Sequence, residues 1–430
     1  VGGGTLHLIG ASIADTAARV DGGAVWATGA SVTLSGVDGV GPVGVAAERG
    51  GLVHIEGGSL TLAEASAVSM SVTDAGGVVS GSGALVVDGL IADDTSASRG
   101  GVVDWSDGTA DIAFLDASDV SAIEGGVVAL RDLREPVVRD GTWLRATASE
   151  RAAGLLVQAS VGGNVSRMRM CGLDSAGDGA GVLVSAPAAG TLAIVNSILV
   201  DNHSMTGGTL AASRRGGLPP AAVSMRNNAV LMDRSQAAFS ASGLSMHTTN
   251  NLVVSAASPM LVGEGATVSG GYNVWPVDAT LPPRAESATD LRVDPGLAPY
   301  RGSSCDHPMW LARTSALRDA GDPEHLDPDG TRSDIGAHGG PDARLPDADA
   351  DGSTADVDCD DTDATVHPGA VDRPWDGIDQ DCDGYDVCDV DGDGDRAVEC
   401  GGPDCDDLDP DVGPGRTDSP YDGVDQDCDG

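Results

Sequence analysis

The stretch Gly76-Gly77-Val78-Val79 recurs along the chain at a nearly constant interval. The same pattern of two glycines followed by two mostly apolar residues occurs at 22–25, 50–53, 100–103 and 125–128, with steps of 28, 26, 24 and 25 residues between successive copies. Weaker copies continue the series, with steps of 28, 27 and 27, at 153–156, 180–183 and 207–210. Marks at so regular an interval indicate an internal structural repeat of about 25 residues.

Short apolar runs with a period of two lie between these marks, for example at 85–91 and 192–200. This alternation predicts β-strands. A unit of two or three short strands with glycine corners is one rung of a β-helix, and its open faces are buried only when rungs stack. We therefore expect an all-β solenoid, whose narrow interior suits a chain with only 3% aromatic residues. The alternative, a row of β-sandwiches, does not explain the constant interval.

Asparagine supplies a second periodic mark. The residues recur with steps of 32, 31, 23 and 23, at Asn164, Asn196, Asn227-Asn228, Asn250-Asn251 and Asn273. In stacked strands, an asparagine can hydrogen-bond to the asparagine of the next layer and so form an amide ladder. We expect such a ladder at one bend of the solenoid.

These repeats resemble those of the right-handed parallel β-helix family, whose extracellular members include pectate-lyase-like and autotransporter-like proteins. The resemblance covers about 1–340 and includes a segment, 317–340, that is similar to the closing rung of such proteins. It implies a right-handed parallel β-helix over 1–300 and a terminal rung or cap with a linker over 301–346. Small Asp/Cys-rich repeats would then occupy 347–430.

The β-helix fold hosts both enzymes and passive rods, so the fold alone does not decide function. A polysaccharide lyase or hydrolase needs carboxylates that converge from neighbouring rungs. The strongest acidic group for that role is Asp104, Asp107, Asp111, Asp116 and Asp119, although solvated turn residues explain it more simply. The isolated His7, His54, His203 and His247 have no second ligand at metal spacing, so we expect solvent-facing or hydrogen-bonded roles.

Charge separates the chain into two parts. The formal net charge is −42 and no lysine occurs, which argues against a nucleic-acid partner because phosphate binding needs clustered basic residues. Residues 347–430 hold 29 acidic residues and three arginines.

The long uncharged run at 179–200 is interrupted by proline and polar residues, so it predicts two strands and no transmembrane segment.

The acidic part contains one pattern twice, 46 residues apart. Asp-Cys-Asp-Asp begins at 358 and 404, and Asp-Gly-x-Asp-Gln-Asp-Cys-Asp-Gly begins at 376 and 422. The cysteines of each copy are 23 residues apart, which favours the bonds Cys359–Cys382 and Cys405–Cys428 and leaves Cys388 and Cys400 for a third. Spacing does not prove connectivity, and the partners of Cys171 and Cys305 stay open. Clustered cysteines indicate an oxidising compartment.

Alternating aspartates give this part its chemistry. Asp-x-Asp-x-Asp-Gly occurs four times, and alternate carboxylates can wrap a hard cation while the glycine turns the loop beneath it. Asp358 stands at position 12 of the loop that begins at Asp347, as in an EF-hand loop, but no flanking helices are visible. The candidate ligands are Asp347, Asp349, Asp351, Asp358, Asp379, Asp381, Asp383, Asp389, Asp391, Asp393, Asp425, Asp427 and Asp429.

These repeats resemble the metal-binding motif of MopE-type bacterial surface proteins and, more distantly, thrombospondin type 3 calcium repeats. The family name implies copper bound through histidines and an oxidised tryptophan, for which His367 and Trp375 are the available residues. His367 has no counterpart in the second copy, where Gly413 stands, and all-oxygen ligands suit calcium whereas copper prefers imidazole and thiolate. We expect several Ca²⁺ ions rather than copper, and we expect calcium to fold this part.

The sequence as a whole predicts a secreted or outer-surface bacterial protein with a structural or adhesive role and no turnover. A carbohydrate-active enzyme on the β-helix is the first alternative, and a self-assembling surface fibre is the second, because an uncapped rung exposes strand edges. The partners that this interpretation allows are surface polysaccharide, a host or neighbouring cell surface, and other copies of the chain.

Overall fold

A computed structural model describes the whole chain except residues 1, 15–22, 41–46, 186–188, 214–221, 233–236, 256–257, 284, 299–302, 313, 344–350, 355–357, 361–362, 383–385 and 421. The chain forms two compact units, residues 1–343 and 344–430. Regular structure in the described residues is almost all β-strand, and the helical elements there are two 3₁₀ turns, η1 (Ser304–Asp306) and η2 (Val398–Cys400). No helix in the described part is long and apolar enough to cross a membrane.

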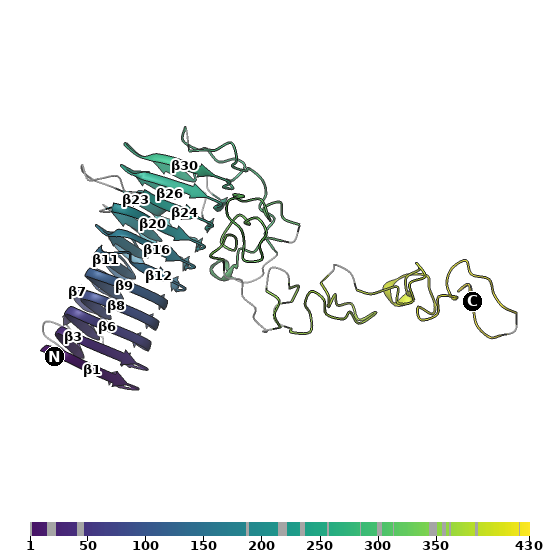
Figure 1. Cartoon of the computed structure of the whole chain (residues 1–430), viewed down its shortest axis with the longest axis horizontal. Helices are drawn as coiled ribbons and strands as arrows, with labels where there is room; N and C mark the ends of the chain where they lie inside the picture. The colour runs from purple at the N-terminus through teal and green to yellow at the C-terminus, as the bar shows by residue number, and fades with distance from the viewer. Residues whose placement is uncertain are drawn as a thin grey trace. The chain divides into compact units, whose positions relative to one another are not determined.

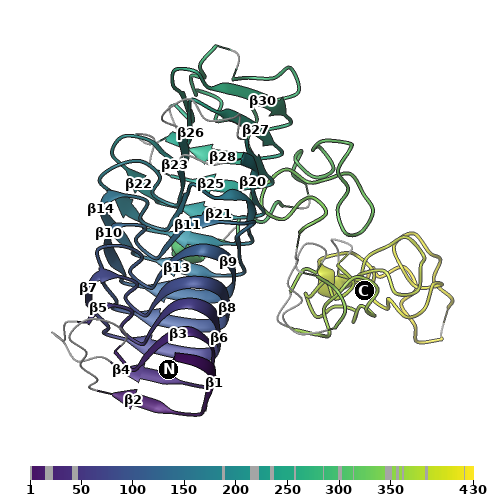
Figure 2. The same cartoon turned by 60° about the vertical axis from the view of Figure 1, so that its left-hand side comes forward.

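The first unit is a parallel β-solenoid, as the repeat predicts. Figures 1 and 2 show its strands stacked in chain order from β1 to β30. The first rungs are long strands, each paired in parallel with the next: β1 (Gly2–Ile9), β3 (Val25–Ser35), β6 (Val53–Val68), β8 (Val79–Asp93) and β9 (Val103–Ser118). Two short strands flank the early rungs, β2 (Ser12–Ala14) and β4 (Asp38–Val40).

Later rungs break into three shorter strands, which continue three parallel ladders. The first ladder is β11 (Val128–Leu133), β15 (Leu155–Gln158), β19 (Val182–Ser185), β23 (Gly208–Ser213), β26 (Ala237–Ser242) and β29 (Met260–Val262). The second is β12 (Val137–Arg139), β16 (Val161–Ser166), β20 (Ala189–Val195), β24 (Ala222–Arg226), β27 (Ser245–Thr249) and β30 (Thr267–Gly271). The third is β13 (Thr142–Leu144), β17 (Arg169–Cys171), β21 (Ile198–Val200), β25 (Ala229–Leu231) and β28 (Leu252–Ser255).

Short strands also line the corner that precedes each rung. They form two small parallel sheets, which Figure 2 shows along one side of the stack. One sheet pairs β5 (Ala47–Arg49) with β7 (Val72–Ala75), and the other contains β10 (Ser121–Glu124), β14 (Thr147–Arg151), β18 (Asp174–Ser175) and β22 (His203–Ser204).

The glycine pairs of the repeat lie at this corner, and the two glycines do different work. Gly76 and Gly100 have φ of +63° and +52°, a left-handed conformation that glycine adopts without strain. Gly77, the second of its pair, sits so close to the next rung that a Cβ there would lie 1.8 Å from the carbonyl oxygen of Gly101. The first glycine therefore turns the chain, and the second lets adjacent rungs approach to strand spacing.

The register corrects two of the three weaker copies of the repeat by one residue. Val128 pairs with Leu155, and Leu155 pairs with Val182, so the copies at 153–156 and 180–183 were each placed one residue late. The copy at 207–210 is in register, because Val182 pairs with Leu210. Ala152 occupies the left-handed corner position, with φ of +56°, where the preceding rung has Gly125. The sequence mark is lost there because alanine has replaced glycine while the backbone conformation persists.

A single continuous apolar core fills the solenoid, and it consists mostly of Val, Leu, Ile and Ala. It also holds three tryptophans, Trp105, Trp143 and Trp275, which are fully buried. The indole N–H of Trp105 donates to the Gly83 carbonyl at 3.1 Å, and that of Trp143 donates to the Leu115 carbonyl at 3.0 Å. These tryptophans are therefore core residues, whereas Trp26 is 46% exposed.

Ion pairs join successive rungs outside the apolar core. Arg131 pairs with Asp104, Arg145 with Asp119 and Arg167 with Asp140, at sequence separations of 26 or 27 residues. Asp111 has its own partner in Arg139. The acidic group expected at 104–119 is thus spread along β9, and four of its five members contact groups of the following rung separately, Asp116 through the backbone N–H of Thr142.

The asparagine ladder is present over the last rungs. Asn251 donates through Nδ2 to Asn273 Oδ1 at 2.9 Å, and its own Oδ1 accepts from Asn228 Nδ2 at 2.9 Å. The backbone N–H of Ser197 extends the ladder at one end and Asp290 extends it at the other. The prediction is confirmed for these three asparagines but is wrong for Asn164, which stands opposite Ala193.

A second column of buried asparagines holds the segment 317–340 against the flank of the solenoid. Asn196 donates to the carbonyls of Ala337 and Gly339, and Asn250 accepts from the backbone N–H of Asp322. A small apolar cluster lies beneath the same segment, and the bond Cys171–Cys305 ties the chain ahead of the segment to β17. The segment expected to close the end of the rod therefore lies along its side.

Asp334 in this flank segment has a raised pKa, so the stability of the fold depends on pH. Burial raises its pKa from 3.8 to about 6, although its carboxylate accepts from the Asp319 N–H at 2.7 Å. The pKa of Asp334 in the folded state lies above its value in the unfolded chain, so ionisation of this carboxyl destabilises the fold. The protonated carboxyl contributes its full stability below pH 4, and that contribution is lost as pH rises through 6. We expect Asp334→Asn to raise the free energy of unfolding by about 1 kcal/mol at pH 8, discounted for partial exposure, and to give no gain at pH 4. Urea unfolding of both proteins at each pH measures the difference, and the exposed Glu324→Gln controls for lost charge.

Candidate metal centre

The second unit has very little apolar core. Its buried apolar residues, among those described, are Val366, Ala397 and Val412 together with the half-cystines Cys382 and Cys388. Burial of so few side chains cannot offset the conformational entropy of ordering more than eighty residues. Covalent bonds and bound ions are the remaining sources of stability for such a small scaffold.

Three disulfide bonds supply the covalent part. They are Cys359–Cys382, Cys388–Cys400 and Cys405–Cys428, with separations of 23, 12 and 23 residues, which confirms the predicted pairing. With Cys171–Cys305 in the first unit, all eight cysteines are paired. The sulfur atoms of the second unit are therefore structural and are not available as thiolate ligands.

The first copy of the repeat gathers three carboxylates. One oxygen each of Asp372, Asp379 and Asp381 lies within 4.8 Å of the others. The chain is folded back on itself here, because Asp372 Oδ1 accepts from the backbone N–H of Gln380 at 2.5 Å and of Asp381 at 3.2 Å. Asp383, the third aspartate predicted for this loop, lies outside the described residues.

The second copy builds the same cluster 46 residues later. Asp418, Asp425, Asp427 and Asp429 bring one oxygen each within 4.8 Å. Asp418 Oδ1 accepts from the backbone N–H of Gln426 at 2.8 Å, as Asp372 does from Gln380. Burial, followed by the charges of Asp429 and Asp418, raises the pKa of Asp427. The neighbouring carboxylates thus add to the effect of burial on Asp427.

A glutamine in each copy fixes the loop around the cluster. Gln380 accepts from the Arg373 N–H at 2.9 Å and donates to Asp376 Oδ2 at 2.7 Å. Gln426 makes the equivalent bonds to the Ser419 N–H and to Asp422 Oδ2. These side-chain bonds brace the loop from outside, which leaves the carboxylates of the cluster facing one another.

A third cluster joins Asp389 and Asp391 to Asp407. Asp389 accepts from the N–H groups of Gly392 and Gly394, the latter with φ of +98°, as the sixth position of a calcium-type loop requires. Burial and the charges of Asp393 and nearby carboxylates raise the pKa of Asp391, and its Oδ2 is enclosed without a hydrogen-bond donor in the described structure.

Asp393 itself faces a different partner. Its Oδ2 accepts from Arg416 Nη2 at 2.6 Å, and its side chain is almost fully buried. A hydrogen bond from the Asp395 N–H, followed by this bond from Arg416, lowers the pKa of Asp393. Of the predicted ligands in this loop, the structure thus brings Asp389 and Asp391 together and directs Asp393 to an arginine.

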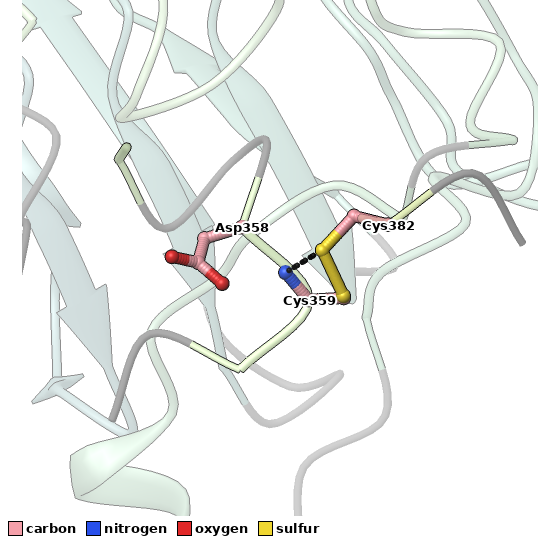
Figure 3. A group of neighbouring side chains, drawn as sticks. All are labelled: Asp358, Cys359 and Cys382. Carbon is pink, nitrogen blue, oxygen red and sulfur yellow. Dashed lines mark hydrogen bonds between the residues drawn. A yellow bond between two sulfur atoms is a disulfide. The ribbon is translucent and has the colours of Figure 1, made fainter. Parts of the chain in front are cut away.

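The first predicted loop is only partly described, because Asp347 and Asp349 lie outside the described residues. Asp351 accepts from the Ser353 N–H at 2.6 Å, and Asp358 accepts from the Asp360 N–H at 2.9 Å. Asp358 is buried beside the Cys359–Cys382 bond, and the Cys359 N–H donates to Cys382 Sγ (Figure 3). Because both sulfur atoms are in the disulfide, this group offers one carboxylate to a metal.

Sequence reasoning missed three carboxylates that complete the clusters. Asp372 and Asp418 lie outside every Asp-x-Asp-x-Asp-Gly stretch, as does Asp407. A signal for two of them was present, because Asp372 and Asp418 are themselves 46 residues apart and occupy the same place in each copy. Asp407 is joined to its cluster by tertiary folding, with the indole N–H of Trp375 donating to its Oδ2 at 2.8 Å.

The donor chemistry of the clusters fits a hard cation. Their ligand atoms are carboxylate oxygens, and the Oδ2 atom of Asp391 is enclosed with no hydrogen-bond donor in the described residues. An enclosed carboxylate oxygen is stabilised by a cation or by a hydrogen bond. The ring of His367 contacts the backbone carbonyl of Pro368 at 3.2 Å. The residues present therefore fit a metal ion bound through oxygen.

Comparison with known families identifies the same region. Residues 358–386 and 404–430 match the family Cu-binding MopE, which is described as "Putative metal-binding motif". The match is narrower than the resemblance expected over 347–430, because 347–357 and 387–403 fall outside it. No curated protein and no solved structure matches the chain. The chain carries a MopE-type metal-binding motif twice, after a parallel β-solenoid.

Proposed function

We propose that this chain is a structural or adhesive protein of the bacterial surface or exterior, in which a β-solenoid is followed by repeats stabilised by calcium. One observation carries the proposal most strongly. The same carboxylate cluster forms twice, 46 residues apart, and each copy is closed by a disulfide bond with a 23-residue separation. Such duplication suits a stiff repeated module, because each copy folds around its own ion.

Calcium is the ion that these clusters favour. Carboxylates held about 4 Å apart repel by roughly 1 kcal/mol per pair even in water, so three or four together need a compensating charge. Ca²⁺ takes six to eight oxygen ligands in flexible geometry, and carbonyl oxygens and water complete such a set. Copper prefers nitrogen and sulfur ligands, and the six cysteines of this unit are in disulfides.

The disulfide bonds support the proposed location. Four of them in one chain point to an oxidising compartment, because cytosolic thiols are kept reduced. Calcium sites of extracellular modules have dissociation constants of about 10⁻⁴ to 10⁻³ M, because calcium is always available outside the cell. The combination supports a role outside the cytoplasm, in which calcium is a structural component.

Ion titration of the full chain tests the metal. We expect native mass spectrometry to show one Ca²⁺ per carboxylate cluster, and calorimetry to give dissociation constants of about 10⁻⁵ to 10⁻³ M. Asp372→Asn is expected to remove the ion of the first copy and to leave that of the second, because it withdraws one ligand from one cluster.

Asp363→Asn is the matched control, since it loses the same charge at an exposed residue that caps Thr365 outside the clusters. Unchanged calcium stoichiometry in Asp372→Asn would contradict the assignment of the cluster. Isolation of the chain with copper rather than calcium in these clusters would replace calcium by copper in the proposal.

A further inference from the structure

A polar pocket of about 270 Å³ opens on the flank of the solenoid. Its walls come from β6, β8, β9 and β11 and from the corner strands β5 and β7. Charged and hydroxyl groups dominate the lining, and the residues that carry the argument are His54, Asp74, Ser80, Arg99, Asp104 and Arg131. The pocket lies entirely within the first unit, so it is independent of the metal clusters.

Rung stacking explains why these side chains converge. His54 stands in register with Ser80, and Ser80 stands in register with Asp104 on the rung after it. Residues in register on adjacent parallel strands are about 4.8 Å apart, so their side chains form one column. Within it, His54 Nδ1 and Ser80 Oγ are 2.7 Å apart. The neighbouring column places Ser106 opposite Arg131.

A buried carboxylate positions the arginines. Asp104 is 4% exposed, and both of its oxygens accept from Arg131 Nη2 at 2.8 Å. Arg99 Nε lies 3.8 Å from Asp104 Oδ2, beyond hydrogen-bond distance, and Arg99 Nη2 lies 3.4 Å from Asp74. Asp104 thus holds two guanidinium groups at one place in the pocket wall.

These two arginines retain unused donors. The Nε atoms of Arg99 and Arg131 are both enclosed, and neither has a hydrogen-bond acceptor among the described residues. An enclosed N–H without an acceptor is costly, and guanidinium groups bind carboxylates and other oxyanions best. Both side chains are also partly exposed, 35% for Arg99 and 25% for Arg131, and both line the pocket, so an oxyanion there can reach the two guanidinium groups.

The rest of the lining narrows the chemistry of the ligand. Glu56, Asp74 and Asp107 also line the pocket, and their carboxylate oxygens can accept hydrogen bonds from hydroxyl groups of a ligand. Their charge, and the net charge of −42 on the chain, repel a multiply charged anion. Trp26, which is 46% exposed, stands in register with His54 on the preceding rung and offers an apolar face beside the pocket.

We propose that this pocket binds a polyhydroxylated carboxylate, with the carboxylate on Arg99 and Arg131 and the hydroxyls on the surrounding acidic residues. The ligand's single negative charge satisfies the arginines without meeting strong repulsion, and its hydroxyls donate to Glu56, Asp74 or Asp107. A ring of this kind can also place a C–H face against Trp26. The solenoid then has a recognition function besides its structural one.

Calorimetry on the calcium-loaded full chain tests the proposal with small probes. We expect D-glucuronate to bind at least tenfold more tightly than D-glucose, which lacks the charge, and than acetate, which lacks the hydroxyls. Sulfate tests for a plain anion site, and L-serine tests for a site that prefers an ammonium group. Failure of glucuronate to bind, or binding of glucose, acetate, sulfate or serine as tight as that of glucuronate, would overturn the proposal.

Variants place the binding in the pocket. Arg99→Gln is expected to weaken glucuronate binding at least tenfold without changing thermal unfolding, because its ion pairs are long and partly exposed. Arg145→Gln is the matched control, since it removes another inter-rung pair, with Asp119, outside the pocket. Trp26→Ala is expected to weaken binding as well and leaves every charge in place. Wild-type affinity in Arg99→Gln would show that glucuronate binds elsewhere.

Discussion

Removal of calcium with EDTA is expected to make residues 344–430 sensitive to protease while residues 1–343 stay resistant. The second unit buries few apolar side chains, and its carboxylates repel one another once the ion is gone. The solenoid is stabilised by a continuous apolar core that does not depend on ions. Limited proteolysis of the full chain, followed by mass spectrometry of the fragments, measures both effects in one experiment.

Two controls separate ion binding from simple screening of charge. EDTA already saturated with calcium should leave the second unit resistant. Added NaCl at 0.5 M screens exposed charges but should not restore resistance in EDTA, because it cannot bridge carboxylates held within one cluster. Resistance of residues 344–430 that persists in EDTA would show that the disulfide bonds alone hold this unit, and the calcium proposal would fail.

Replacement of Asn251 by alanine is expected to destabilise the solenoid by about 3–4 kcal/mol, the largest effect among single polar residues in its interior. Asn251 is fully buried and makes four ladder bonds: to Met225, to Asn273 and, as acceptor, two from Asn228. Alanine leaves these partners buried with fewer bonds and opens a small cavity. Urea unfolding monitored by circular dichroism measures the loss.

Asn164→Ala is the matched control for the ladder. Asn164 is only partly buried and stands opposite Ala193, outside the amide column. We expect it to cost less than about 1 kcal/mol, as is usual for a residue without a buried network. Equal losses in the two variants would mean that the ladder adds nothing beyond local packing.

Much of the solenoid was predictable because the residues that stacking requires recur along the sequence. Gly76 and Gly77 are needed at the corner for conformation and for close approach, so the interval between such pairs gives the rung length directly. The prediction slipped by one residue where Ala152 adopts the same left-handed conformation without a glycine to mark it. The left-handed backbone conformation is therefore kept at a corner where another residue has replaced the glycine that usually marks it.

Placement of the flank segment could not be predicted in the same way. Its contacts with Asn196 and Asn227 span more than a hundred residues of sequence, and nothing in the local pattern of 317–340 identifies that partner surface. The metal clusters show both cases. Asp379 and Asp381 lie within a recognisable motif, whereas Asp407 joins Asp389 and Asp391 only through tertiary folding.

The bond between Cys171 and Cys305 has a mechanical consequence. A tensile force applied through the C-terminal repeats would first peel the segment after Cys305 from the solenoid and would then pass through the sulfur atoms to Cys171. The chain between the two cysteines, which are 134 positions apart, would be bypassed. The rungs from β19 to β30 therefore could not be pulled off the solenoid from that end. Reduction of this one bond would allow the chain between Cys171 and Cys305 to be extended by the force.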